Sequence, residues 1–98
     1  MNSEKQIEKK FCDKVKSIGG MALKFMATAC AGVPDRIVLL PNGKVYFVEL
    51  KREGGRISAI QNIMFEKFQR LGSPVRIIST EKMIDEFIAE VCEDVTSI

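Results

Sequence analysis

The hydrophobic positions of this chain repeat with two different periods, one typical of helices and one typical of strands. Three segments carry apolar residues at helical spacing, and each follows a Ser or Thr that can act as an N-cap. Short apolar segments between them are typical of strands. The pattern predicts helices at about 4–18, from 58 to 71 and from 80 onward, and strands at 21–26, 35–40, 44–51 and 75–79.

Local signals fix where several of these elements begin and end. Ser3 with Gln6, and Ser58 with Gln61, each form the S-x-x-Q box that marks a helix N-terminus. A strong hairpin turn, Pro41-Asn42-Gly43, joins the second and third strands. We expect the apolar stripes of the two later helices to pack in a core, although either could meet a partner. These stripes are Ile60, Met64, Phe65, Phe68 and Leu71, and then Met83, Ile84, Phe87, Ile88 and Val91.

The order of the elements, α-β-β-β-α-β-α, predicts an α/β fold with a central mixed sheet flanked by helices. The third strand, its following helix and the fourth strand form a right-handed crossover unit, which makes that strand pair parallel. The earlier strands form a meander. At 98 residues we expect residues 1–98 to be one domain with a modest core.

The composition excludes several kinds of site. The chain has no histidine, so it cannot carry a Ser-His-Asp or Cys-His catalytic arrangement or a Cys-His zinc finger. Its three cysteines, Cys12, Cys30 and Cys92, form no CxxC pair, which favours a reducing compartment over a disulfide framework. No long apolar run and no signal peptide are visible, so we expect a cytoplasmic protein without a membrane segment.

Charge is distributed unevenly along the chain. The net charge is +2, but residues 1–79 hold 14 Lys and Arg against 7 Asp and Glu, whereas residues 80–98 hold 1 against 6. The basic part would attract a polyanion such as nucleic acid. An ordinary solvated surface with segregated charges is the alternative explanation.

The candidate chemistry lies in a G-V-P-D motif ending at Asp35, followed after thirteen residues by Glu49-Leu50-Lys51. Because strand residues two apart share a face, Glu49 and Lys51 project together and Leu50 points the other way. If the turn centres on Asn42-Gly43, Asp35 and Glu49 meet at the open end of the hairpin.

Two carboxylates so placed suit a hard divalent cation, Mg²⁺ or Mn²⁺, which prefers oxygen ligands. The backbone carbonyl of Leu50 could supply a third oxygen. Lys51 could orient a water or stabilise charge on phosphate oxygens. The alternative is a surface ion pair of Glu49 with Lys51 or Arg52, which contributes roughly 0–1 kcal/mol.

The run from Gly32 to Gln61 resembles the virus-type replication and repair nuclease family, the VRR-NUC domain, of the PD-(D/E)xK nuclease superfamily. The motifs P-D, E-L-K, G-G and S-x-x-Q all occur in the family's order and spacing. The similarity extends over about residues 20–79 and includes the first helix more loosely. The resemblance implies a restriction-endonuclease-like core.

The resemblance implies that Asp35 and Glu49 are metal ligands and that Lys51 is the catalytic lysine. Gln61 corresponds to a glutamine near the family's site, although its place in a capping box also explains it. Family members often carry arginines before G-V-P-D, whereas residues 27–31 here read A-T-A-C-A. Thr28 or backbone amides would have to make any phosphate contact from that loop.

A glutamate on the first helix completes the site in this superfamily, as a catalytic residue and a further metal ligand. Glu8 is the candidate, over Glu4, because Glu8 lies beside the Ile7/Phe11 face, whereas the helix dipole already accounts for an acid in the first turn. A solvated role for Glu8 stays open. The residues we expect to contact nucleic acid are Arg36, Arg52, Arg56 and Lys24.

The function implied is a Mg²⁺- or Mn²⁺-dependent, structure-selective DNA endonuclease that acts on branched DNA, without a small-molecule cofactor. Stand-alone family members resemble Holliday-junction resolvases, so the resemblance also implies a homodimer, of phage or prophage origin, in a bacterial cytoplasm. A noncatalytic module that binds branched DNA is the alternative. A weaker one is a restriction-type nuclease with sequence preference.

Overall fold

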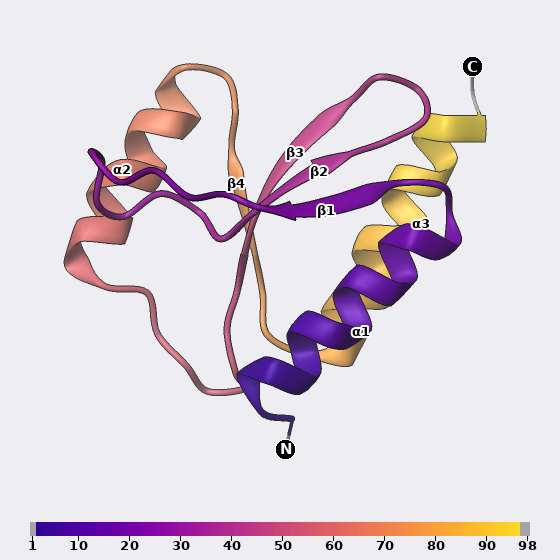
Figure 1. Ribbon diagram of the computed structural model, residues 1–98, viewed down its shortest axis with the longest axis horizontal. Coiled ribbons are helices and arrows are strands. Elements are labelled where there is room, and N and C mark those ends of the chain that lie inside the picture. The colour runs from indigo at the N-terminus through magenta and orange to yellow at the C-terminus, as the bar shows by residue number, and fades with distance from the viewer. Residues whose placement is uncertain (1, 97–98) are drawn as a thin grey trace.

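Four strands form one sheet with helices on both of its faces (Figure 1). The computed structural model describes the backbone of residues 2–96 and the side chains of residues 2–93. In chain order the elements are α1 (Glu4–Ser17), β1 (Met21–Lys24), β2 (Arg36–Leu39), β3 (Val45–Leu50), α2 (Ala59–Arg70), β4 (Val75–Ile78) and α3 (Glu81–Thr96). The predicted α/β class and element order are confirmed, with strands one or two residues shorter at their ends.

The strand order is β1-β2-β3-β4. The first three strands pair antiparallel, as a meander, and β3 pairs with β4 in parallel after the crossover through α2. The turn at Asn42-Gly43 closes through the Gly43 N–H, which donates to the Leu40 carbonyl at 2.9 Å, with Gly43 at a φ of +83°. This turn fixes the pairing of Leu39 with Val45 and so the register of the whole hairpin.

All three predicted helix starts are present. In both capping boxes the Ser hydroxyl accepts the Gln backbone N–H and the Gln side chain accepts the Ser backbone N–H. Thr80 accepts the Met83 N–H at 3.1 Å through its hydroxyl. None of the helices within residues 2–96 combines the length and hydrophobicity that a membrane crossing requires.

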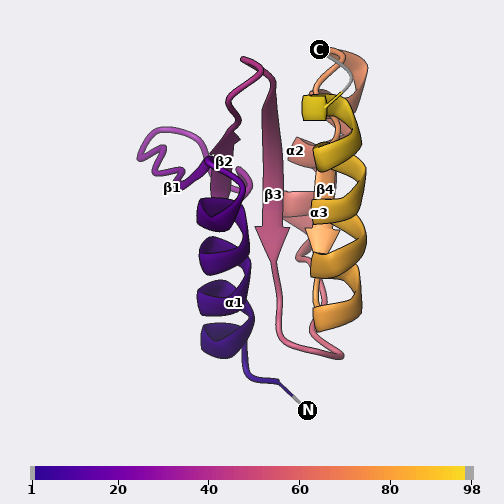
Figure 2. The same cartoon turned by 90° about the vertical axis from the view of Figure 1, so that its right-hand side faces the viewer.

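The sheet separates two layers of helices. Helices α1 and α3 lie side by side on one face and α2 lies on the other, and Figure 2 shows β3 in the gap between α1 and α3. Neighbouring residues of β3 contact the helices on the two opposite faces. Tyr46 packs edge-on against Phe87 of α3, with ring centroids 5.4 Å apart, and Phe47 packs edge-on against Phe68 of α2, at 5.1 Å. Strand β3 is therefore common to both layers.

The main hydrophobic core lies beneath α1 and α3. Its buried members are Ile7, Phe11, Val15, Val38, Leu40, Val48, Leu50, Ile78, Ile84, Phe87 and Val91. The apolar stripe of α3 is thus core, as expected, except that Met83 is exposed.

The apolar stripe predicted for α2 is partly wrong. Phe65 is buried and Phe68 is half-buried, but Ile60 and Leu71 are exposed. Leu71 is the C-cap residue, beyond the last turn of the helix. The first turn of α2 lies over the loop after β1, so Ile60 contacts Gly32 of that loop.

Exposed apolar residues remain on the sheet face that α2 covers only in part. Met21 pairs with Leu39 and Leu39 with Val45, so these three side chains share a face, and Leu23 lies on the same face two residues along. All four are exposed. We call Met21, Leu23, Leu39 and Val45 the apolar sheet band.

The acidic last helix lies directly against the basic first helix. Lys10 of α1 pairs with Glu81 of α3 at 2.9 Å, and Lys14 pairs with Asp85 at 3.8 Å. The positive charge that the sequence places on α1 is therefore partly neutralised within the fold.

Candidate functional site

The hairpin register brings the two predicted carboxylates together. Arg36 pairs with Val48, and one residue further toward the open end of the hairpin Asp35 lies opposite Glu49. The Asp35 backbone N–H donates to Glu49 Oε1 at 3.1 Å, and the Leu50 backbone N–H donates to Asp35 Oδ2 at 3.2 Å. Each carboxylate thus accepts a backbone N–H of the opposite strand where the ladder ends.

Glu49 is buried, with only 1% of its surface exposed. Its second oxygen, Oε2, accepts a hydrogen bond of 2.8 Å from the Gln61 amide nitrogen and lies 3.1 Å from the Lys51 ammonium. A buried carboxylate is costly unless it is paired and hydrogen-bonded, and here both conditions are met. The side chain of Lys51 is 21% exposed, so this cluster opens to solvent on the lysine side.

Gln61 makes two contacts, one within the capping box of α2 and one with Glu49. Its Oε1 accepts the Ser58 backbone N–H at 2.9 Å, which completes the capping box of α2. Because the oxygen is held there, the amide nitrogen faces Glu49. The capping box therefore fixes which end of the amide reaches the carboxylate.

The environment shifts the proton affinity of Glu49. Burial, first, and the nearby Asp35 carboxylate, second, raise the pKa of Glu49, while Lys51 and Gln61 oppose the rise. The two negative charges therefore repel each other at close range. A divalent cation between them would relieve this repulsion.

The raised pKa predicts how the metal-free protein responds to pH. The folded chain holds the Glu49 proton more tightly than the unfolded chain, so the stability contributed by Glu49 is fully present below its unfolded pKa and is lost as pH rises through its folded pKa. Urea unfolding in EDTA, from about pH 4 to about pH 8, should show the wild type losing stability relative to Glu49→Gln as pH rises. A constant difference would contradict this expectation.

Glu8 lies beside the cluster and does not join it. It lines, together with Asp35, Lys24 and Arg36, a hollow of about 260 Å³ at the sheet edge, and its carboxylate lies 3.9 Å from the Arg36 guanidinium. Among the described side chains, those of residues 2–93, no three Asp, Glu, Cys or His residues form a group that could hold a metal ion. The described site is thus a two-carboxylate site.

The four residues predicted to contact nucleic acid occupy different environments. Arg52, Arg56 and Lys24 are exposed. Arg36 is only 11% exposed in its side chain, and its Nε is a buried donor without a partner in the described part of the chain. Arg36 is therefore better placed to hold Glu8 than to reach a ligand in solvent.

One feature beside the site was not predicted from the sequence. A hollow of about 630 Å³ lies between the loop after β1 and the first turn of α2, and Gln61 is part of its lining. No signal in the sequence indicates this hollow, because Ile60 fits the apolar stripe of the predicted helix and is expected in the core. Only the fold shows that this loop approaches the helix at Gly32.

Comparisons with known proteins agree with the geometry. The family model for the VRR-NUC domain matches residues 1–82. A phage protein named "Putative nuclease p44", from Acyrthosiphon pisum secondary endosymbiont phage 1, is 39% identical over 80 residues, which cover 82% of this chain and 86% of that protein. A solved structure described as a VRR-NUC domain matches with a TM-score of 0.81 and 27% identity, covering 90% of this chain and 97% of that chain.

Proposed function

The chain belongs to the VRR-NUC domain family of nucleases, and we propose that it is a divalent-metal-dependent endonuclease that cleaves branched DNA as a homodimer. The observation that carries the proposal is the cluster at the open end of the β2–β3 hairpin. There the buried Glu49 lies opposite Asp35 and contacts both Lys51 and Gln61.

The residues at this cluster fit a hard cation. Mg²⁺ binds through one or two carboxylates and completes its octahedral shell with waters and substrate phosphates, so Asp35 and Glu49 suffice as protein carboxylates. The Leu50 N–H is directed at Asp35, and the N–H and C=O of one strand residue point to the same side, which favours the Leu50 carbonyl as a third oxygen. Mg²⁺ or Mn²⁺ bound there would activate water and polarise the phosphodiester.

Lys51 and Gln61 act on the same carboxylate from two sides. Gln61 holds Glu49 Oε2 in place from the capped start of α2. Lys51, at the solvent side of the cluster, is placed to bind a phosphate oxygen and to stabilise negative charge that develops during cleavage. Arg52 and Arg56, both exposed on the segment between β3 and α2, can bind the phosphates on either side.

The exposed apolar surface supports a homodimer, and a homodimer suits a branched substrate. The apolar sheet band is exposed, and a second copy packed there would remove it from water. A symmetric pair would present two sites to two strands of branched DNA. Sedimentation of the purified protein measures the oligomeric state directly. The phage origin of the 39% identical protein supports a role in cutting phage DNA within a bacterial cell.

The test is a cleavage assay on branched and linear DNAs with Mg²⁺ and with Mn²⁺, run beside Asp35→Ala. We expect the wild type to cut a branched DNA faster than a linear duplex of the same sequence, and the variant to fall to the level of the metal-free reaction. Faster cutting of linear duplex would contradict branch selectivity but leave the nuclease assignment standing.

A noncatalytic DNA-binding module is the second candidate, because the exposed basic side chains of Lys24, Arg52 and Arg56 could bind phosphates without any cleavage chemistry. Titration with Mn²⁺ separates the two. A binding module would hold branched DNA without nicking it at any metal concentration, whereas a nuclease would produce nicks that EDTA prevents.

A further inference from the structure

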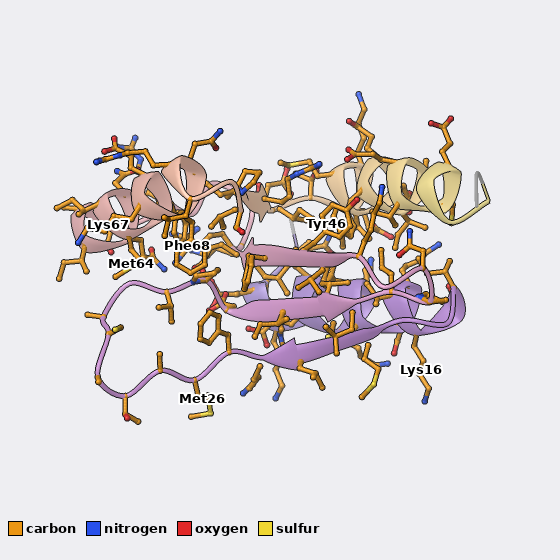
Figure 3. All side chains as sticks on the ribbon, turned by 90° about the horizontal axis from the view of Figure 1, so that it is seen from above. Lys16, Met26, Tyr46, Met64, Lys67 and Phe68 are labelled. Atoms are coloured by element: carbon orange, nitrogen blue, oxygen red, sulfur yellow. The ribbon has the colours of Figure 1, made fainter. Side chains whose placement is uncertain are left out.

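The open hollow beside the candidate site carries no charge. It has eleven lining residues, from the loop after β1 and from the start of α2, and none is Lys, Arg, Asp or Glu. Its large exposed apolar members are Met26 and Ile60, and its polar members include Ser58 and Gln61. We call this the uncharged hollow. Figure 3 shows Met26 on the wide bend of the loop, with Met64 and Phe68 of α2 across from it.

Close packing of the backbone shapes the uncharged hollow. Gly32 has a φ of +84°, and a Cβ at this position would lie 2.8 Å from the Ile60 carbonyl oxygen. The loop therefore approaches the first turn of α2 more closely than any residue with a side chain would allow. Ile60 is held in place there, although 57% of its surface is exposed.

Gln61 connects the uncharged hollow to the carboxylates. It lines the hollow and donates its amide N–H to Glu49 at 2.8 Å. The hollow and the carboxylates are therefore neighbours, so a nucleotide with its phosphate at Asp35 and Glu49 can extend its sugar and base toward the hollow.

The chemistry of the lining distinguishes the parts of such a nucleotide. A phosphate in the hollow would lose water without meeting a cation, which is costly. A nucleobase is flat and largely apolar on its faces, and would bury the exposed side chains of Met26 and Ile60 while its edge meets hydroxyl and amide groups. The bases of a duplex are stacked and paired, so only an unpaired base can enter, and the unpaired base at a branch costs least to place there.

We propose that the uncharged hollow binds an unpaired nucleobase adjacent to the cleaved phosphate and so selects branched or single-stranded positions in DNA. This inference rests on the proposed nuclease function only in that the neighbouring phosphate is the one cleaved. The binding of the base is an independent claim and can be measured without cleavage.

The test compares Ile60→Asn with Ile63→Asn. Both residues lie on α2, with 57% and 58% of their surface exposed, but only Ile60 lines the hollow. The DNA is a branched oligonucleotide with 2-aminopurine at the unpaired position. Each protein is titrated into this DNA in a buffer that contains Ca²⁺ in place of Mg²⁺. We expect the wild type and Ile63→Asn to change the fluorescence of the probe on binding, and Ile60→Asn to lose most of that change at equal melting temperature.

Cleavage of the same DNA gives the second readout. We expect Ile60→Asn to lower kcat/KM about 10-fold on DNA with the base present, and to have no effect when that position is abasic. Equal behaviour of the two variants, or no fluorescence change with the wild type, would overturn the proposal. A change from dimer to monomer in Ile60→Asn alone would assign the hollow to a second copy and also overturn it. A wild type that alters the fluorescence but cleaves nothing would reject the nuclease function and leave the base site intact.

Discussion

Lys51→Met is expected to reduce the kcat of DNA cleavage by about 100- to 1,000-fold, which is the effect of removing one group that stabilises charge in a transition state. The ammonium of Lys51 lies 3.1 Å from Glu49 Oε2 and is partly open to solvent, so it can reach both the carboxylate and a bound phosphate. Methionine keeps most of the side chain's length and apolar stem but removes the charge. Single-turnover cleavage of a branched DNA at saturating Mn²⁺ measures the effect.

Two further variants identify the cause. Lys82→Met, at an exposed position of α3, removes one positive charge elsewhere and should leave cleavage unchanged. Lys51→Arg keeps the charge but not the compact ammonium, and we expect it to remain at least about 10-fold below the wild type because a planar guanidinium does not fit the same contact. Cleavage by Lys51→Met at the wild-type rate would reject the assigned role.

Gln61→Glu is expected to destabilise the metal-free protein by about 1–3 kcal/mol, although glutamate is as good a capping-box residue as glutamine. The amide nitrogen that donates to Glu49 Oε2 at 2.8 Å becomes an oxygen, so a hydrogen bond is replaced by repulsion beside a buried carboxylate. Urea unfolding in EDTA near neutral pH measures the change.

The chain carries its own control in the capping box of α1. There Gln6 Oε1 accepts the Ser3 N–H at 2.8 Å, as Gln61 Oε1 accepts the Ser58 N–H at 2.9 Å. Gln6 is exposed, and no hydrogen bond among the described residues joins its amide to Asp35 or Glu49. Gln6→Glu should change stability by less than about 0.5 kcal/mol. Equal effects of the two substitutions would mean that the hydrogen bond between Gln61 and Glu49 does not contribute to the free energy of unfolding.

The parts of the site set by local signals could be predicted from the sequence. The turn at Asn42-Gly43 fixes the hairpin register, and the register alone sets Asp35 opposite Glu49. Strand alternation then places Lys51 on the face of Glu49. The serine boxes predicted the starts of α1 and α2, and both are as expected.

The parts that depend on how helices pack could not be predicted. Glu8 faces Arg36 because of where α1 lies on the sheet, which no local pattern encodes. The exposure of Ile60 and of the apolar sheet band depends on how little of the sheet α2 covers, whereas hydrophobic periodicity records only which residues share a face.

The sharing of β3 by both helix layers also sets when a newly made chain becomes able to cut DNA. Asp35, Glu49 and Lys51 leave the ribosome before α2 and β4, but Gln61 belongs to α2, and β3 is an inner strand only once β4 has paired with it. A nascent chain that ends before β4 therefore has the carboxylates without the element that holds them. Nuclease activity should therefore appear only after α2 and β4 have been made.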